Sequence, residues 1–154
     1  GTKVFILIPQ ILLFLETLRK WPIAGLLGRV CTESYVIPDT SIIVEKGTKV
    51  FIPINALQRD LKFFPDPERF DPERFSKENV TKIVPGSYLP FGDGPRFCIG
   101  MRLALTDVKV MLILVISKYV LSLSSRSPKP ITFDRKSFTL SPQGKIFLHF
   151  KNRK

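Results

Sequence analysis

The stretch PFGDGPRFCIG, residues 90–100, combines one of the chain's two cysteines with three glycines, two prolines and an arginine. A thiolate that binds a metal must stay deprotonated at pH 7, although the ordinary thiol pKa is about 8.5, so it needs positive charge, amide donors or the metal itself. Cys98 comes directly before a predicted helix, so free N–H groups and the positive end of the helix dipole point toward its sulfur. Arg96 can bind a carboxylate through two parallel hydrogen bonds. The loop therefore suits a thiolate ligand beside a group that carries carboxylates.

The glycines and the small number of ligand-type residues narrow the chemistry. Gly92 and Gly94 permit backbone angles closed to other residues, and Gly100 lets the start of the helix approach a flat partner. With Cys31 and Cys98 as the only cysteines and His149 as the only histidine, neither a disulfide scaffold nor a four-ligand zinc site can be assembled. One axial thiolate to a haem iron fits, because the macrocycle supplies the remaining ligands.

This loop resembles the haem-binding signature of the cytochrome P-450 monooxygenases, through Phe91, Gly92, Gly94, Arg96, Cys98 and Gly100. The resemblance implies a haem b cofactor with Cys98 as the iron ligand. It also implies that Arg29, in PIAGLLGRVC, donates to a haem propionate. The implied cofactor-binding residues are Arg29, Phe91, Gly92, Arg96, Cys98 and Gly100. No catalytic residue is assigned in this chain, because the family's proton-delivering acidic residue and threonine lie on an upstream central helix.

Two further motifs occur in the order that the resemblance implies. Glu16 and Arg19 resemble the Glu-x-x-Arg pair of the family's K helix, and Arg74, in the second copy of DPERF, resembles the arginine that completes a buried triad. An i, i+3 pair of charges by itself is an ordinary helix-surface interaction. We expect Glu16, Arg19 and Arg74 to form a buried network that holds the helix against the coil before the cysteine loop.

The first half of the chain is predicted to form a helix and a small sheet. The helix runs from residue 10 to Arg19 or Lys20 and stops before Pro22. Short β-branched runs at 34–38, 41–47 and 48–54 predict a meander or a set of hairpins. Residues 60–75 hold three prolines and four aromatics, which favours an ordered but irregular segment.

The second half is predicted to be one long helix and a final hairpin. Helically spaced apolar residues from about Ile99 to about Val120 predict a largely buried helix. SFTL at 137–140, SPQG at 141–144 and KIFLHF at 145–150 predict strand, turn and strand. The fold class is mixed α and β. It corresponds to the C-terminal part of the cytochrome P-450 fold: K helix, small β-sheet, meander, Cys loop, long L helix and C-terminal β-hairpin.

The resemblance makes residues 1–154 the C-terminal haem-binding portion of a single domain, in which 1–15 match poorly. The apolar stretch at 4–15 is interrupted by Pro9 and Gln10 and is shorter than the roughly 20 residues of a bilayer span, so we expect a buried helix start. Gln58 replaces the histidine usual in the family and Leu61 replaces the usual proline, so we expect local packing to differ there. Segments 23–27 and 140–143 match substrate-contacting segments.

The chain has 24 basic and 13 acidic residues, and residues 101–154 hold 11 of the basic and 2 of the acidic ones. Such a surface attracts nucleic acid, anionic lipid or an acidic protein. A basic module that binds nucleic acid or membrane leaves the cysteine loop unexplained, and no nucleic-acid motif accompanies the charge. We therefore expect no nucleic-acid partner.

The resemblance implies a haem-thiolate monooxygenase that inserts one oxygen atom of O2 into an apolar small-molecule substrate, with electrons from an acidic NADPH-cytochrome reductase. It also implies a place on the cytoplasmic face of the endoplasmic reticulum membrane, through an N-terminal anchor outside this sequence. The alternative is a non-catalytic truncated fragment that at most binds haem. The two interpretations share every motif, and we expect the 154 residues alone not to catalyse oxygenation.

Overall fold

A computed structural model describes residues 2–137 and 139–153 of the chain, with side chains from residue 11 onward. Helix α1 (Thr2–Lys20) ends where the sequence predicts, because Trp21 and Pro22 follow it. It begins earlier than predicted, since the backbone on both sides of Pro9 is helical. Of the apolar stretch expected to be a buried helix start, residues 4–10 lie outside the described side chains. Residues 11–15 are not buried, and Leu13 is 41% exposed. Across the described residues, no helix combines the length and the apolar character that a membrane crossing needs.

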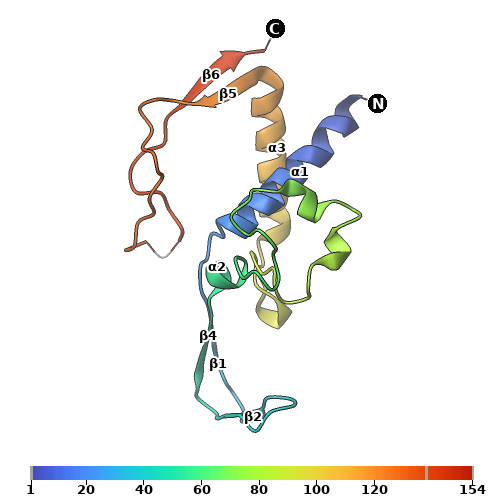
Figure 1. Cartoon of the computed structure of the whole chain (residues 1–154), viewed down its shortest axis with the longest axis vertical. Coiled ribbons are helices and arrows are strands. Elements are labelled where there is room, and N and C mark those ends of the chain that lie inside the picture. The colour runs from blue at the N-terminus through green and yellow to red at the C-terminus, as the bar shows by residue number, and fades with distance from the viewer. Residues whose placement is uncertain (1, 138, 154) are drawn as a thin grey trace.

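A narrow antiparallel ribbon extends away from the helices (Figure 1). At the base of the ribbon, β1 (Leu27–Val30) pairs with β4 (Lys49–Ile52). At its tip, β2 (Tyr35–Val36) pairs with β3 (Ile43–Val44). The three predicted β-branched runs contain β2, β3 and β4. Strand β1 was not predicted, because its four residues include a glycine and form a strand only by pairing with β4.

Helix α2 (Ile54–Leu57) leads from the ribbon into a long irregular segment. Only single 3-10 turns interrupt this coil, at η1 (Pro72–Phe75) and η2 (Val80–Lys82). The Asp71 side chain caps η1 by accepting a hydrogen bond from Glu73 N. The prediction of an ordered, irregular segment is confirmed, and its aromatic residues Phe64 and Phe75 are buried.

The cysteine loop ends in the turn η3 (Gly94–Arg96), which is followed by helix α3 (Met101–Lys118). The predicted helix extended to about Val120, but Tyr119 and Val120 already belong to β5 (Tyr119–Leu123). The expectation of a largely buried helix is wrong for this chain, because α3 has no buried residue. Its apolar side chains Leu103 and Met111 are 67% and 64% exposed, since α3 packs mainly against α1 and leaves its other faces open.

The C-terminal hairpin pairs different segments from those predicted. Strand β6 (Leu148–Asn152) is antiparallel to β5, with Tyr119 opposite Asn152 and Leu123 opposite Leu148. The predicted partner at 137–140 forms no strand with it: Thr139 makes a single bridge to Ala24, and residue 138 lies outside the described residues. A local sequence pattern does not show which of several strand-like segments will pair. Strands β5 and β6 pair although residues 124–147 separate them in the sequence.

The buried core is small and lies at the C-terminal end of α1. Its buried hydrophobic residues are Leu18, Ile54, Phe64, Phe75 and Leu89. They come from α1, α2 and the irregular segment, so the core joins α1 to the coil that precedes the cysteine loop.

An ion pair lies in the middle of this core. Both oxygens of Glu16 accept hydrogen bonds from Arg19, at 2.7 and 2.8 Å, and both residues have 0% exposure. Glu16 also accepts a hydrogen bond from Asp71 N at 2.9 Å. Arg74 Nε lies 3.8 Å from Glu16 Oε1, and its Nη2 donates to Asp66 O. The predicted buried pair of Glu16 and Arg19 is confirmed. Arg74 joins it only through this 3.8 Å ion pair: it is half-buried, and its Nε makes no hydrogen bond among the described residues.

The buried pair predicts a specific stability defect. Glu16→Ala leaves the Arg19 guanidinium buried and unpaired, which costs about 3–5 kcal/mol, a large part of a domain's stability. We expect a loss of folded full-length protein, measured by soluble yield. Glu78→Ala, at an exposed carboxylate, is the matched control. Normal soluble yield in Glu16→Ala would contradict the structural role of the pair.

Candidate functional site

The cysteine loop is folded by two glycines in the left-handed region. Gly92 has a φ of +73° and Gly94 a φ of +70°, so the expected backbone freedom is used at both positions. A turn from Leu89 to Gly92 opens the loop, through a 3.1 Å hydrogen bond from Gly92 N to Leu89 O. Cys98 N donates to Phe91 O at 2.8 Å and so closes it. The loop is thus a closed ring of backbone with Cys98 at its end.

The Cys98 side chain is exposed at the entry to α3. It does not precede the helix directly, because Ile99 and Gly100 intervene and Gly100 is the N-cap. Met101 N donates to Cys98 O at 3.3 Å, so the cysteine belongs to the turn that starts the helix. A Cβ at Gly100 would lie 4.0 Å from the Cys98 sulfur, so the glycine keeps that side of the sulfur open. Within the described part of the chain, no hydrogen bond engages this sulfur.

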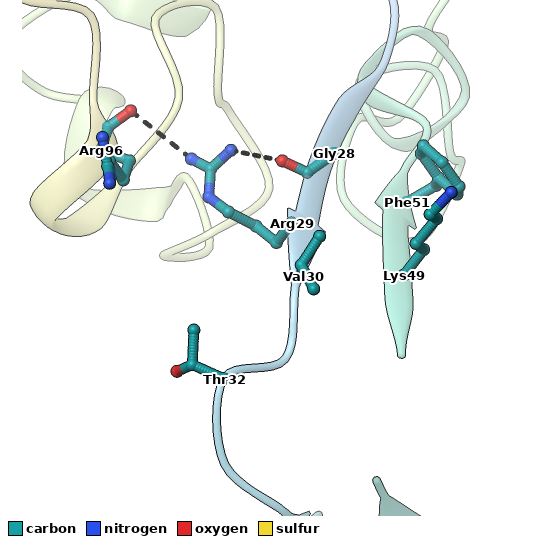
Figure 2. Close-up of a pocket in the computed structure, with 7 residues that line it drawn as sticks. All are labelled: Gly28, Arg29, Val30, Thr32, Lys49, Phe51 and Arg96. Carbon is teal, nitrogen blue, oxygen red and sulfur yellow. Dashed lines mark hydrogen bonds between the residues drawn. The ribbon is translucent and has the colours of Figure 1, made fainter. Parts of the chain in front are cut away.

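Arg29 and Arg96 line one pocket of about 570 Å³ between the ribbon and the cysteine loop (Figure 2). Arg29 reaches from β1, donating to Gly28 O at 2.9 Å and to Arg96 O at 3.5 Å. The other lining residues are Gly28, Val30, Thr32, Lys49 and Phe51. Arg29 points toward Arg96, whereas Lys49 pairs with Val30 and lies on the opposite face of the ribbon (Figure 2). Among the described residues no carboxylate lines the pocket, so the two arginines suit an anionic group such as a carboxylate.

The remaining predicted site residues support this arrangement through the backbone. Phe91 is partly buried and contributes its carbonyl to Cys98 N. Gly92 lies against β1, since a Cβ built on it would be in van der Waals contact with Leu27 at 3.7 Å and with Arg29 Nη2 at 3.9 Å. Its positive φ, rather than lack of space, is what favours glycine here. The structure thus brings Arg29, Gly92 and Arg96 together at the pocket.

Two residues around this site, Lys49 and Tyr88, were not predicted, and Gln58 was predicted only as a departure from the family's pattern. Lys49 is among the lining residues because β4 pairs with β1, and it lies on the ribbon face opposite Arg29. Tyr88 donates a 2.9 Å hydrogen bond from its hydroxyl to Leu15 O on α1, and burial, reinforced by the nearby Glu16 carboxylate, raises the pKa of its phenol so that it stays protonated. Gln58 joins α1 to Leu89. None of the three carries a motif, because each acts through a partner distant in sequence.

The residues present fit a haem-type ligand. The Cys98 thiol ends a glycine-rich loop whose Arg96 lines the cationic pocket, and among the described residues no three His, Cys, Asp or Glu side chains gather as a metal cluster. A cofactor that supplies the other ligands of a metal bound through Cys98 fits this arrangement, and the arginines would meet that cofactor's carboxylates.

Comparison with known proteins agrees with this chemistry. The family model for cytochrome P450 matches residues 13–149, and the chain belongs to the cytochrome P450 family. Members of this family are monooxygenase oxidoreductases that use haem.

Curated relatives from insects and mammals match most of the chain. It is 42% identical to cytochrome P450 6l1 of Blattella germanica over 88% of its length, and 41% identical to cytochrome P450 6B1 of Papilio polyxenes over 91%. It is 44% identical to cytochrome P450 3A13 of Mus musculus over 90%. These matches cover 27%, 28% and 27% of the relatives, so the chain spans about a quarter of their length.

Proposed function

We propose that this chain is the haem-binding part of a monooxygenase in which the Cys98 thiolate is the proximal ligand of haem b. The observation that carries the proposal is the exposed Cys98 thiol at the entry to α3, on a loop held by Gly92 and Gly94 and beside a cationic pocket. The proposal concerns the full-length protein.

Each site residue has a role in holding the cofactor. Arg29 and Arg96 pair with the two propionates, because carboxylates that enter a partly apolar site need charged partners. The positive φ of Gly92 shapes the loop against β1, Phe91 holds Cys98 N, and Gly100 leaves room beside the sulfur. The free N–H groups at the start of α3 favour the negative charge of the thiolate.

When bound, haem supplies the activation of O2, and the thiolate ligand favours cleavage of the O–O bond. The reaction inserts one oxygen atom into a C–H bond of an apolar small molecule. The other atom leaves as water, with two electrons and one proton from NADPH and a second proton from solvent. In this proposal, segments 23–27 and 140–143 line the pocket that holds the substrate. No residue of this chain acts as the proton donor.

The electrons come from an acidic NADPH-cytochrome reductase that docks on the face carrying the cysteine loop. Lys82 on η2, Arg102 in the first turn of α3 and Lys109 two turns later provide positive charge for this docking. The proposal places the protein on the cytoplasmic face of the endoplasmic reticulum membrane, near that reductase. Its animal relatives support only the coarser class of microsomal membrane enzyme.

The ligand assignment predicts different results for the two cysteines. In the full-length protein, Cys98→Ala should abolish both the thiolate spectrum of the reduced carbon monoxide complex and turnover. Cys31→Ala is the matched control, because the Cys31 thiol donates to Glu33 O and Val44 O at a distance from the loop. Loss of the spectrum in Cys31→Ala but not in Cys98→Ala would reverse the assignment.

The propionate assignment predicts weaker haem binding. Each of Arg29→Leu and Arg96→Leu removes one charged hydrogen-bond donor, so haem affinity should fall about ten- to a hundredfold. Titration of the apoprotein with haem measures this, with the exposed Arg135→Leu as control. Unchanged affinity in both variants would exclude the pairing.

The docking proposal predicts a defect limited to reductase-supported turnover. Charge reversal of Lys82 and Lys109 together should slow that turnover most at low salt, because salt screens electrostatic steering. Peroxide-driven turnover needs no reductase and should be unchanged. Reversal of Lys145 and Lys151, exposed beside and on β6, is the control. Equal losses in both assays would mean that Lys82 and Lys109 support folding or haem binding instead.

A further inference from the structure

Gln58 is a fully buried polar residue, with 0% exposure, and it lies just after α2. Its Nε2 donates two hydrogen bonds to α1, to Leu18 O at 3.0 Å and to Arg19 O at 2.9 Å. Its Oε1 accepts one from Leu89 N at 2.9 Å. Both amide hydrogens and the amide oxygen are therefore satisfied, as burial of such a group requires.

The two donated bonds complete the C-terminus of α1. The last four carbonyls of a helix have no partner within it. In α1, each of these four carbonyls accepts a hydrogen bond. Trp21 N donates to Thr17 O, the Gln58 side chain donates to Leu18 O and Arg19 O, and the Arg59 side chain donates to Lys20 O. In return, Arg19 donates to the backbone carbonyl of Gln58 at 2.8 Å. Gln58 is thus fixed to the most strongly held part of the molecule.

The accepted bond leads to the cysteine loop. Leu89 N donates a hydrogen bond to Gln58 Oε1. The carbonyl of the same residue accepts a hydrogen bond from Gly92 N, in the turn at the start of the loop. Two residues after Leu89, the Phe91 carbonyl accepts the N–H of Cys98. The sequence of contacts therefore runs from α1 through the Gln58 amide to the turn at Leu89 and then to Cys98.

An amide suits this position better than other side chains of similar size. A leucine offers neither donor nor acceptor, and it would leave the N–H of buried Leu89 unpaired. A neutral imidazole has one donor and one acceptor, so the histidine usual in the family can serve only two of the three partners. Glutamine provides two donors and an acceptor, and it does not titrate.

From these contacts we infer that Gln58 is a positioning residue for the iron ligand. It fixes the start of the cysteine loop to the end of α1 and so sets where Cys98 lies relative to the core. The inference rests on the proposed function only for the role of Cys98, because the contacts themselves involve α1, Gln58 and Leu89.

The test compares two variants at the end of α1 in the full-length, haem-loaded protein. Gln58→Leu removes the contact to the loop, whereas Arg59→Gln removes only the hydrogen bond to Lys20 O and the ion pair with Glu68. Amide hydrogen exchange at Leu89 and Cys98 is measured relative to amides within α3. We expect Gln58→Leu to speed exchange at both sites about ten- to a hundredfold relative to α3, and Arg59→Gln to leave this ratio unchanged. Equal ratios in the two variants would overturn the inference.

Gln58→His decides the question if Gln58→Leu does not fold. A neutral imidazole keeps one donor for the end of α1 and one acceptor for Leu89 N. Protection of Leu89 and Cys98 should therefore stay within about threefold of wild type, since the hydrogen bond that limits local opening is retained. Loss of their protection in this variant would show that the acceptor does not hold the loop.

A second readout separates this inference from the proposed function. If both hold, Gln58→Leu lowers the fraction of haem with the thiolate spectrum, and Arg59→Gln does not. If the wild-type protein lacks the thiolate spectrum, the proposed function fails while the exchange ratios still test Gln58. If the spectrum is present and the exchange ratios are equal, Gln58 is not the positioning residue and Cys98 remains the ligand.

Discussion

The buried ion pair of Glu16 and Arg19 is the interaction on which the rest of the structure depends. Two charges removed from water are stabilising only if their geometry is good and further hydrogen bonds satisfy them. Here Arg19 donates to both Glu16 oxygens and to the carbonyls of Gln58, Pro67 and Arg69. These carbonyls belong to segments without regular structure, so the guanidinium gives the irregular coil a fixed place against α1.

That fixed coil carries the cysteine loop. Tyr88 and Leu89 immediately precede the loop and are hydrogen-bonded, respectively, to Leu15 on α1 and to Gln58. The loop then needs only local devices, namely two glycines with positive φ and the bond from Cys98 N to Phe91 O. The ribbon approaches from the other side and brings Arg29 to Arg96. The coil fixed to α1 therefore holds the loop with its thiol, and the ribbon completes the cationic pocket beside that loop.

The chain buries few hydrophobic residues for its composition. Its apolar residues make up 44% of the sequence, yet α3 has no buried residue and Ile99, next to Cys98, is fully exposed. The exposed apolar side chains of α3 and of the ribbon lie outside the core at the end of α1. The relatives are nearly four times as long as the part matched here. The hydrophobic pattern of α3 is therefore typical of a buried helix, but the described residues of this chain do not bury it.

The sequence by itself determined the features that depend on neighbouring residues. Pro22 ends α1, the prolines of 60–75 prevent regular structure, and Gly92 and Gly94 allow the backbone of the cysteine loop. The family resemblance added Arg29 and the triad around Glu16. Only the tertiary structure decided which strands pair, how exposed α3 is, and that Lys49, Tyr88 and Gln58 lie around the site. Each of these depends on contacts between residues far apart in the chain, such as the 31 positions between Gln58 and Leu89, and local propensity carries no information about such contacts.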